Sequence, residues 1–81
     1  MNLVELTEYL VKMVVNKPDM VSVKQFDDED DYMIIQVLVE ESDMGAVIGK
    51  GGAVANAIRT LVQATAYANH LKKVKINIDS F

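Results

Sequence analysis

The amino-acid sequence predicts a domain of the α+β class, in which the elements follow the order helix, strand, strand, helix, helix, strand. Two long segments, residues 3–14 and 53–69, repeat apolar residues at the spacing of an amphipathic helix. Three short runs are rich in β-branched residues and predict strands, namely residues 21–26, 32–39 and 74–78. With 81 residues the chain has room for one hydrophobic core, so we expect residues 1–81 to form a single domain.

The first helix is predicted to begin at a capping box. Asn2 and Glu5 have the spacing at which each side chain accepts from the other's backbone amide. The apolar stripe that should face the core comprises Leu3, Leu6, Leu10 and Met13 or Val14. The helix should stop at residues 16–18, because Pro18 restrains the preceding residue and has no amide hydrogen to donate.

The first two strands are predicted to form a hairpin with an acidic tip. Residues 32–39 are apolar on both faces, as expected for the central strand of a sheet. Residues 27–31 are all acidic, and their mutual repulsion suits a solvated turn between the strands. A calcium loop would need spaced ligands and a glycine, which this run lacks, so we predict no metal site.

The second half of the chain is predicted to hold two helices and the last strand. Ser42 and Asp43 are good N-caps for a short helix that runs through Ile48. The long helix that follows should turn one face to the core, carrying Ile58, Leu61, Val62 and Thr65. On the last strand, alternation places three lysines outward, with a structural or weakly electrostatic role: Lys72, Lys73 and Lys75.

The composition excludes several classes of protein. Hydrophobic residues make up 51% of the chain, which is globular rather than disordered. The absence of cysteine excludes disulfides and thiolate metal sites. Charges interrupt the apolar residues of the N-terminal segment, and no run could span a membrane, so we expect a soluble cytoplasmic protein. The net charge of −4 disfavours nucleic acid unless positive charge is concentrated locally.

Nothing in the sequence predicts catalysis. His70, the only histidine, follows the long helix without an evident catalytic companion. The carboxylates of residues 27–31 should lie in open water, where they lack the environment that acid–base catalysis needs. We therefore predict no enzymatic activity, no catalytic residue, no cofactor and no small-molecule substrate.

The most informative segment is the glycine-rich loop at residues 49–52, between the short and the long helix. Backbone amides at the start of the long helix have no partner within it and carry the positive end of its dipole, which favours an anion. A nucleotide-binding P-loop requires a different glycine spacing and a Ser or Thr after its lysine, and the dinucleotide fingerprint also fails. What remains is a Gly-x-x-Gly sequence between two helices.

The loop and its flanks resemble the KH domain, in which such a loop clamps the backbone of about four unpaired nucleotides. The resemblance rests on Val47-Ile48-Gly49-Lys50-Gly51-Gly52 and on three positions of the long helix, Ala55, Ile58 and Arg59. Element order and length resemble the type II KH proteins of the bacterial KhpA family over almost the entire chain. The resemblance implies a type II KH fold with helices packed on one face of a three-stranded sheet.

The resemblance also implies a non-catalytic regulator or RNA chaperone that binds single-stranded RNA. We expect the RNA-binding residues to be Ile48, Gly49, Lys50, Gly51, Gly52, Asn56 and Arg59. The expected protein partner is a second copy, in a homodimer, or a Jag-type KH protein (KhpB), in a heterodimer. Either the first helix or a second chain should cover the small-residue stripe of the long helix, formed by Ala57, Leu61, Ala64 and Ala68. The alternative function is a KH-shaped adaptor that acts mainly through dimerisation.

Overall fold

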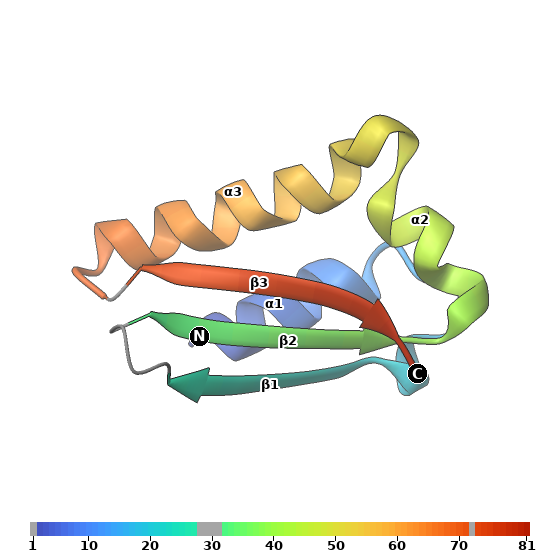
Figure 1. The fold of residues 1–81 in the computed structure, drawn as a ribbon, viewed down its shortest axis with the longest axis horizontal. Helices are drawn as coiled ribbons and strands as arrows, with labels where there is room; N and C mark the ends of the chain where they lie inside the picture. Colours follow the sequence, from blue (N-terminus) through green and yellow to red (C-terminus); the bar gives the residue numbers. More distant parts are fainter. Residues whose placement is uncertain (1, 28–31, 72) are drawn as a thin grey trace.

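The computed structural model describes residues 2–27, 32–71 and 73–81, and it confirms the α+β class and the predicted order of elements (Figure 1). Three short 3₁₀ turns lie between the main elements: η1 (Pro18–Met20), η2 (Glu41–Asp43) and η3 (Lys50–Gly52). The helices and strands are α1 (Leu3–Lys12), β1 (Ser22–Asp27), β2 (Met33–Val39), α2 (Met44–Ile48), α3 (Ala53–Ala68) and β3 (Val74–Ser80).

The sheet has the order β1-β2-β3, so the prediction that β2 is the central strand is confirmed. β1 pairs with β2 in antiparallel fashion, and β2 pairs with β3 in parallel. The inward side chains of β2 and β3 form the core with α1 and α3, which pack against the sheet. Each fully buried aliphatic side chain contributes about 1.5–3 kcal/mol, and those with no exposed surface are Val11, Ile35, Val37, Val39, Val47 and Val62.

α1 begins at the predicted capping box, and Leu3, Leu6 and Leu10 of the predicted stripe contact the core, but the stripe also includes Thr7 and Val11. The Asn2 Oδ1 accepts from the Glu5 amide at 2.8 Å, and the Glu5 Oε1 accepts from the Asn2 amide at 3.4 Å. The buried residues are Leu3, Thr7 and Val11. Burial of Thr7 is tolerated because its hydroxyl donates to the carbonyl of Leu3 at 2.7 Å.

The last predicted position of that stripe, Met13 or Val14, is wrong. Met13 is 65% exposed and Val14 is 37% exposed. Both residues lie beyond Lys12, the last residue of α1.

α3 also differs from prediction in the residues that face the core. Its buried side chains are Ala55, Ile58, Val62 and Ala66. Leu61, predicted to be buried, is 53% exposed, because it lies about 100° around the helix from Val62. The small-residue stripe Ala57, Leu61, Ala64 and Ala68 is exposed, so α1 does not cover it.

α3 ends in a Schellman motif whose left-handed residue is not glycine. The Leu71 amide donates to the Ala66 carbonyl at 2.9 Å, and the His70 amide donates to the Tyr67 carbonyl at 3.1 Å. His70 has a φ of 57°, the conformation that favours glycine at this position. These bonds turn the chain sharply from α3 toward β3.

Residues 28–31, most of the predicted acidic hairpin tip, lie outside the described residues, as does Lys72 of the predicted lysine cluster. In the part of the chain that the structure describes, no helix is both long enough and apolar enough to cross a membrane.

Candidate functional site

The glycine-rich loop between α2 and α3 has a backbone that few side chains would permit. Gly49, Gly51 and Gly52 have φ values of 75°, 63° and 81°. At Gly49 a Cβ atom would lie only 2.5 Å from the Cγ2 of Val54, so both the conformation and the space require glycine. At Gly51 a Cβ would meet nothing within 4 Å, so this position is open to a close approach from outside.

The start of α3 is left open by the protein itself. Gly52 occupies the N-cap, and no side-chain hydrogen bond caps either α3 or η3. Within the described residues, the amides of Lys50 and Gly51 donate to no other residue. Unpaired amides at the positive end of a 16-residue helix favour the binding of an anion.

The predicted site residues lie at the end of α2, along this loop and in the first two turns of α3. Lys50 and Asn56 are exposed, whereas Ile48 and Arg59 are half-buried. The Arg59 Nε donates to the Ile76 carbonyl at 3.2 Å, and its Nη1 donates to the Asn56 Oδ1 at 3.3 Å. Arg59 therefore reaches across from α3 to the edge of β3 beside the loop.

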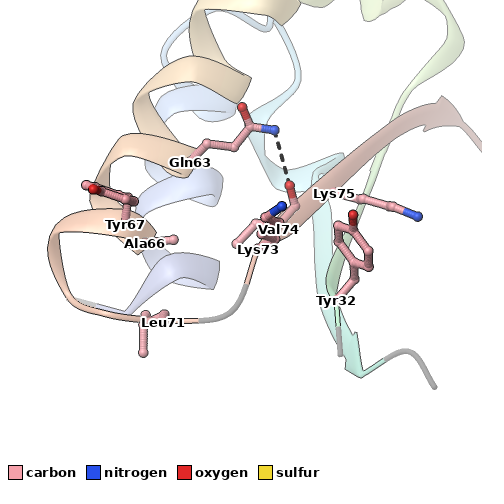
Figure 2. A pocket seen from close by; sticks show the side chains of 8 residues that line it. All are labelled: Tyr32, Gln63, Ala66, Tyr67, Leu71, Lys73, Val74 and Lys75. Atoms are coloured by element: carbon pink, nitrogen blue, oxygen red, sulfur yellow. Dashed lines mark hydrogen bonds between the residues drawn. The ribbon is translucent and has the colours of Figure 1, made fainter. Parts of the chain in front are cut away.

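Farther along α3, the same helix face meets β3 at a cavity that sequence analysis missed (Figure 2). The Gln63 Nε2 donates to the Val74 carbonyl at 3.1 Å. The cavity has a volume of about 400 Å³. Its lining includes Tyr32, Gln63, Tyr67, Leu71, Lys73 and Lys75.

The residues of the cavity are distant in sequence, and only the fold assembles them. Tyr32 precedes β2 and Tyr67 lies in the last turn of α3, and both line the same cavity. The Lys75 Nζ lies 4.2 Å from the centroid of the Tyr32 ring, a cation–π contact. Lys75 is exposed on β3, as predicted from the alternation of that strand, and Lys73 is exposed just before it.

The charge distribution along the chain is the sequence signal that would have drawn attention to this surface. None of the 12 acidic residues lies in residues 44–78. That segment holds five of the 8 basic residues, namely Lys50, Arg59, Lys72, Lys73 and Lys75. The net charge of −4 thus conceals a cationic segment that contains the loop, α3 and most of β3.

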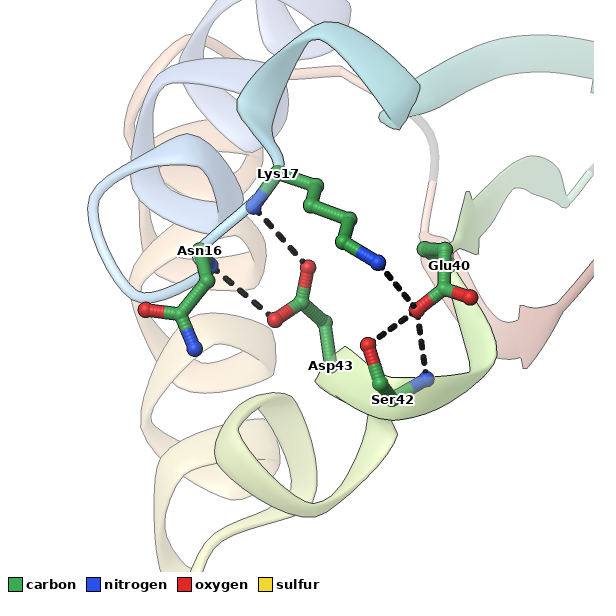
Figure 3. A network of polar contacts seen from close by, with 5 residues as sticks. All are labelled: Asn16, Lys17, Glu40, Ser42 and Asp43. Carbon is green, nitrogen blue, oxygen red and sulfur yellow. Dashed lines mark hydrogen bonds and ion pairs between the residues drawn. The ribbon is translucent and has the colours of Figure 1, made fainter.

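A buried carboxylate positions α2 relative to the chain that follows α1 (Figure 3). Asp43 is 1% exposed, and its Oδ1 and Oδ2 accept from the amides of Asn16 and Lys17 at 3.0 and 3.1 Å. Asp43 is the N-cap residue of α2, as predicted, but its side chain does not cap the helix. It satisfies two amides of the preceding connection instead, and so holds the start of α2 in place.

Glu40 forms a smaller polar cluster next to Asp43 (Figure 3). Its Oε2 accepts from the hydroxyl of Ser42 and, at 2.7 Å, from the amide of Ser42, and lies 3.6 Å from the Lys17 Nζ. The Ser42 hydroxyl and amide, with a smaller contribution from Lys17, hold the pKa of Glu40 below its ordinary value. Because this pKa is lowered, the cluster stabilises the fold at neutral pH, and its contribution is lost as the pH falls through that pKa.

Comparison with known sequences places nearly the whole chain in one family. Residues 4–78 match the family model described as KhpA/KhpB, KH domain. RNA-binding protein KhpA from Clostridium perfringens is 43% identical over 74 residues, which are 91% of this chain and 96% of that protein. RNA-binding protein KhpA from Borreliella burgdorferi is 39% identical over 77 residues, which are 95% of this chain and 92% of that protein.

Comparison with solved structures shows the same fold inside a larger protein. Era from Aquifex aeolicus matches with a TM-score of 0.70 and 14% identity, covering 98% of this chain and 30% of that one. Era in complex with a segment of 16S ribosomal RNA matches with a TM-score of 0.67 and 16% identity, covering 96% and 29%. At such low identity the likeness concerns the fold alone.

Proposed function

The chain belongs to the KhpA/KhpB family of KH-domain proteins, and we propose that it binds single-stranded RNA at the glycine-rich loop. One observation carries the proposal: the amides of Lys50 and Gly51, within the described residues, have no internal partner at the uncapped start of α3. Phosphate oxygens are acceptors that such amides bind. The related KhpA proteins are named as RNA-binding proteins, which supports RNA as the ligand.

Each site residue has a role that follows from its place. The exposed ammonium group of Lys50 pairs with a phosphate, while the neighbouring amides donate to the same part of the strand. Gly51 allows the sugar-phosphate chain to come close to the loop backbone, because no protein atom lies within 4 Å of where its Cβ would be. Ile48 offers an apolar contact to a base, and Asn56 and Arg59 form a polar border beside it. Backbone contacts dominate this arrangement, so sequence preference is modest. The names of the related KhpA proteins support a role in RNA binding without catalysis.

Fluorescence anisotropy with a labelled unpaired RNA, at several salt concentrations, tests the loop. Lys50→Asp together with Gly51→Asp should weaken binding about tenfold or more and flatten its salt dependence, because phosphate contacts are lost. The matched control, Lys24→Asp together with Gln25→Asp, makes the same charge change on the exposed part of β1 and should bind more tightly than the loop variant. Equal affinity of the loop variant and the wild type would contradict the proposal.

We further propose that the chain acts in the bacterial cytoplasm as a regulator or RNA chaperone and pairs with a second KH module. The partner is another copy or a KhpB-type protein, and the exposed stripe Ala57, Leu61, Ala64 and Ala68 supplies the contact. Leu61, which is 53% exposed, lies among three exposed alanines, so the four residues form one apolar strip on the surface of α3. Two modules that hold one strand would gain avidity, which compensates for weak single contacts.

Sedimentation velocity tests the pairing surface. Leu61→Asp should shift the chain, alone or mixed with a KhpB-type protein, toward the monomer, whereas Thr60→Asp on the same helix should do so less. An unchanged sedimentation coefficient for Leu61→Asp would contradict this surface.

The adaptor alternative has less support, because the relatives are named for RNA binding. A pull-down with and without nuclease separates the two functions: partners that are lost with nuclease indicate RNA, and partners that persist indicate an adaptor.

A further inference from the structure

The cavity at the C-terminal end of α3 lies on the same helix face as the glycine-rich loop. Asn56, Arg59, Gln63 and Tyr67 follow one another at intervals of three or four residues, so they form one stripe along α3. Arg59 and Gln63 both donate to carbonyls of β3, which shows that this stripe runs along the edge of that strand. The stripe begins at the loop and ends at Tyr67, which lines the cavity.

The chemistry of the cavity suits an unpaired nucleotide. Tyr67 is 85% exposed, so its ring is available for stacking, and Leu71 beside it is 47% exposed. Lys73 is exposed just before β3, and the Lys75 Nζ lies over the Tyr32 ring. Among the described residues that line the cavity none is acidic. Aromatic rings beside ammonium groups are the combination that binds a base together with its phosphate.

The separation of the two sites fits one continuous strand. Tyr67 lies about 22 Å along α3 from Gly52, at the helical rise of ~1.5 Å per residue. At ~3.4 Å per stacked nucleotide, about six or seven nucleotides cover that length, and an extended strand needs fewer. The loop alone clamps about four nucleotides, so a longer strand can reach the cavity.

We propose that this cavity is a second nucleotide subsite, in which Tyr67 stacks on a base and Lys73 contacts the adjoining phosphate of a strand already held at the loop. The inference rests on the proposed function, because the loop holds the strand in register with the cavity. Binding at the subsite extends the RNA footprint along the α3–β3 edge.

Anisotropy with unpaired RNAs of two lengths tests the subsite: about four nucleotides, which the loop accommodates, and about ten, which also reach the cavity. Tyr67→Ala should weaken binding of the long strand about fivefold or more through lost stacking, the ratio that corresponds to ~1 kcal/mol, and Lys73→Glu should weaken it similarly through the lost phosphate contact. Binding of the short strand should not change. Tyr67→Phe, which keeps the ring, should bind both strands like the wild type.

An abasic scan of the long strand gives a second readout, which does not depend on measuring the weak short strand. At the position that occupies the cavity, an abasic site should lower the affinity of the wild type to that of Tyr67→Ala. The same abasic site should not lower the affinity of Tyr67→Ala further, because the base and the ring act as one pair.

Matched controls make the outcomes distinct. Tyr9→Ala removes another exposed tyrosine, on α1, and Lys24→Glu reverses a charge on β1; both should bind the long strand like the wild type. Suppose that Tyr67→Ala binds the long strand like the wild type and the Lys50 and Gly51 double variant binds it more weakly. RNA binding at the loop is then supported, and the second subsite is overturned. If the double variant binds like the wild type, the proposed function itself fails. If Tyr67→Ala changes self-association and not RNA affinity, the cavity is a protein contact and the inference is overturned.

Discussion

The first turns of α1 and α3 both contain backbone amides without a partner inside the helix, and the two helix starts differ in how these amides are bonded. At the start of α1, Asn2 and Glu5 accept hydrogen bonds from each other's amides, so the helix is closed by its own side chains. At the start of α3, the N-cap is Gly52 and no side chain accepts from the exposed amides. The first helix start serves the stability of the fold alone, whereas the second leaves its donors available to a ligand.

The start of α2 lies between these extremes. Its N-cap residue, Asp43, has a carboxylate that suits capping, yet the carboxylate accepts from Asn16 and Lys17. The start of α2 is thus held by a carboxylate that binds a neighbouring segment, that of α1 by its own cap, and that of α3 by neither. Four substitutions test how these helix ends and the loop are held.

The largest effect is expected at Gly49, where the loop conformation depends on the missing side chain. Gly49→Ala should lower the free energy of unfolding by about 3 kcal/mol, because it combines a positive φ with overpacking against Val54. Urea denaturation measures the loss. Gly45→Ala is the control, since nothing lies within 4 Å of its Cβ and it sits inside α2; it should be neutral or stabilising. Equal stability of the two variants would mean that the loop is not constrained at Gly49.

Asp43→Ala should have the next largest effect. Two part-buried amides lose their acceptors, so the free energy of unfolding should fall by about 2 kcal/mol. Asp43→Asn keeps one acceptor oxygen and should lose less, which separates hydrogen bonding from packing. The measurement is again urea denaturation. A loss equal to that of Glu41→Ala, an exposed neighbour, would show that the carboxylate has no anchoring role.

Removing the cap of α1 should affect stability and not binding. Asn2→Ala should lower the free energy of unfolding by about 1 kcal/mol, with RNA affinity unchanged in the anisotropy assay. Asn77→Ala, at an exposed position of β3, should change stability by less than about 0.5 kcal/mol. A weaker affinity for RNA in Asn2→Ala would contradict the division between a structural and a functional helix start.

The smallest effect is expected at the other end of α3. His70→Gly should raise the free energy of unfolding by about 0.5 kcal/mol, because glycine adopts the positive φ of this position without strain. The urea midpoint should rise slightly. Asn69→Gly should lower it, since Asn69 has a φ of −99° and its amide group donates to the Thr65 carbonyl at 2.8 Å. If both variants lower the urea midpoint, the positive φ of His70 does not destabilise the wild-type protein.

Features that depend on neighbours in sequence were predictable. The capping box, the central strand and the glycine-rich loop each have a signature within a few residues, and the structure has all three. The seven expected site residues lie in one segment, from the last residue of α2 through the loop to the second turn of α3. Their roles in binding remain a proposal.

Features that depend on distant neighbours were not predictable. The bonds of Asp43 cross 27 and 26 residues of sequence, and no local pattern marks an N-cap that turns its side chain elsewhere. Tyr32 and Tyr67 look scattered until β2, β3 and α3 bring them to one cavity. The exposure of Leu61 depends on how α3 is rotated against the sheet, and helical spacing alone allowed either orientation.

The parallel pairing of β2 with β3 has a consequence for how the protein is made. The loop and α3 form the crossover between these two strands, and β3 follows both of them in the chain. The glycines therefore leave the ribosome before Ile76, the β3 residue whose carbonyl accepts from Arg59. The hydrogen bonds by which Arg59 and Gln63 hold α3 against β3 can form only after translation has passed that strand.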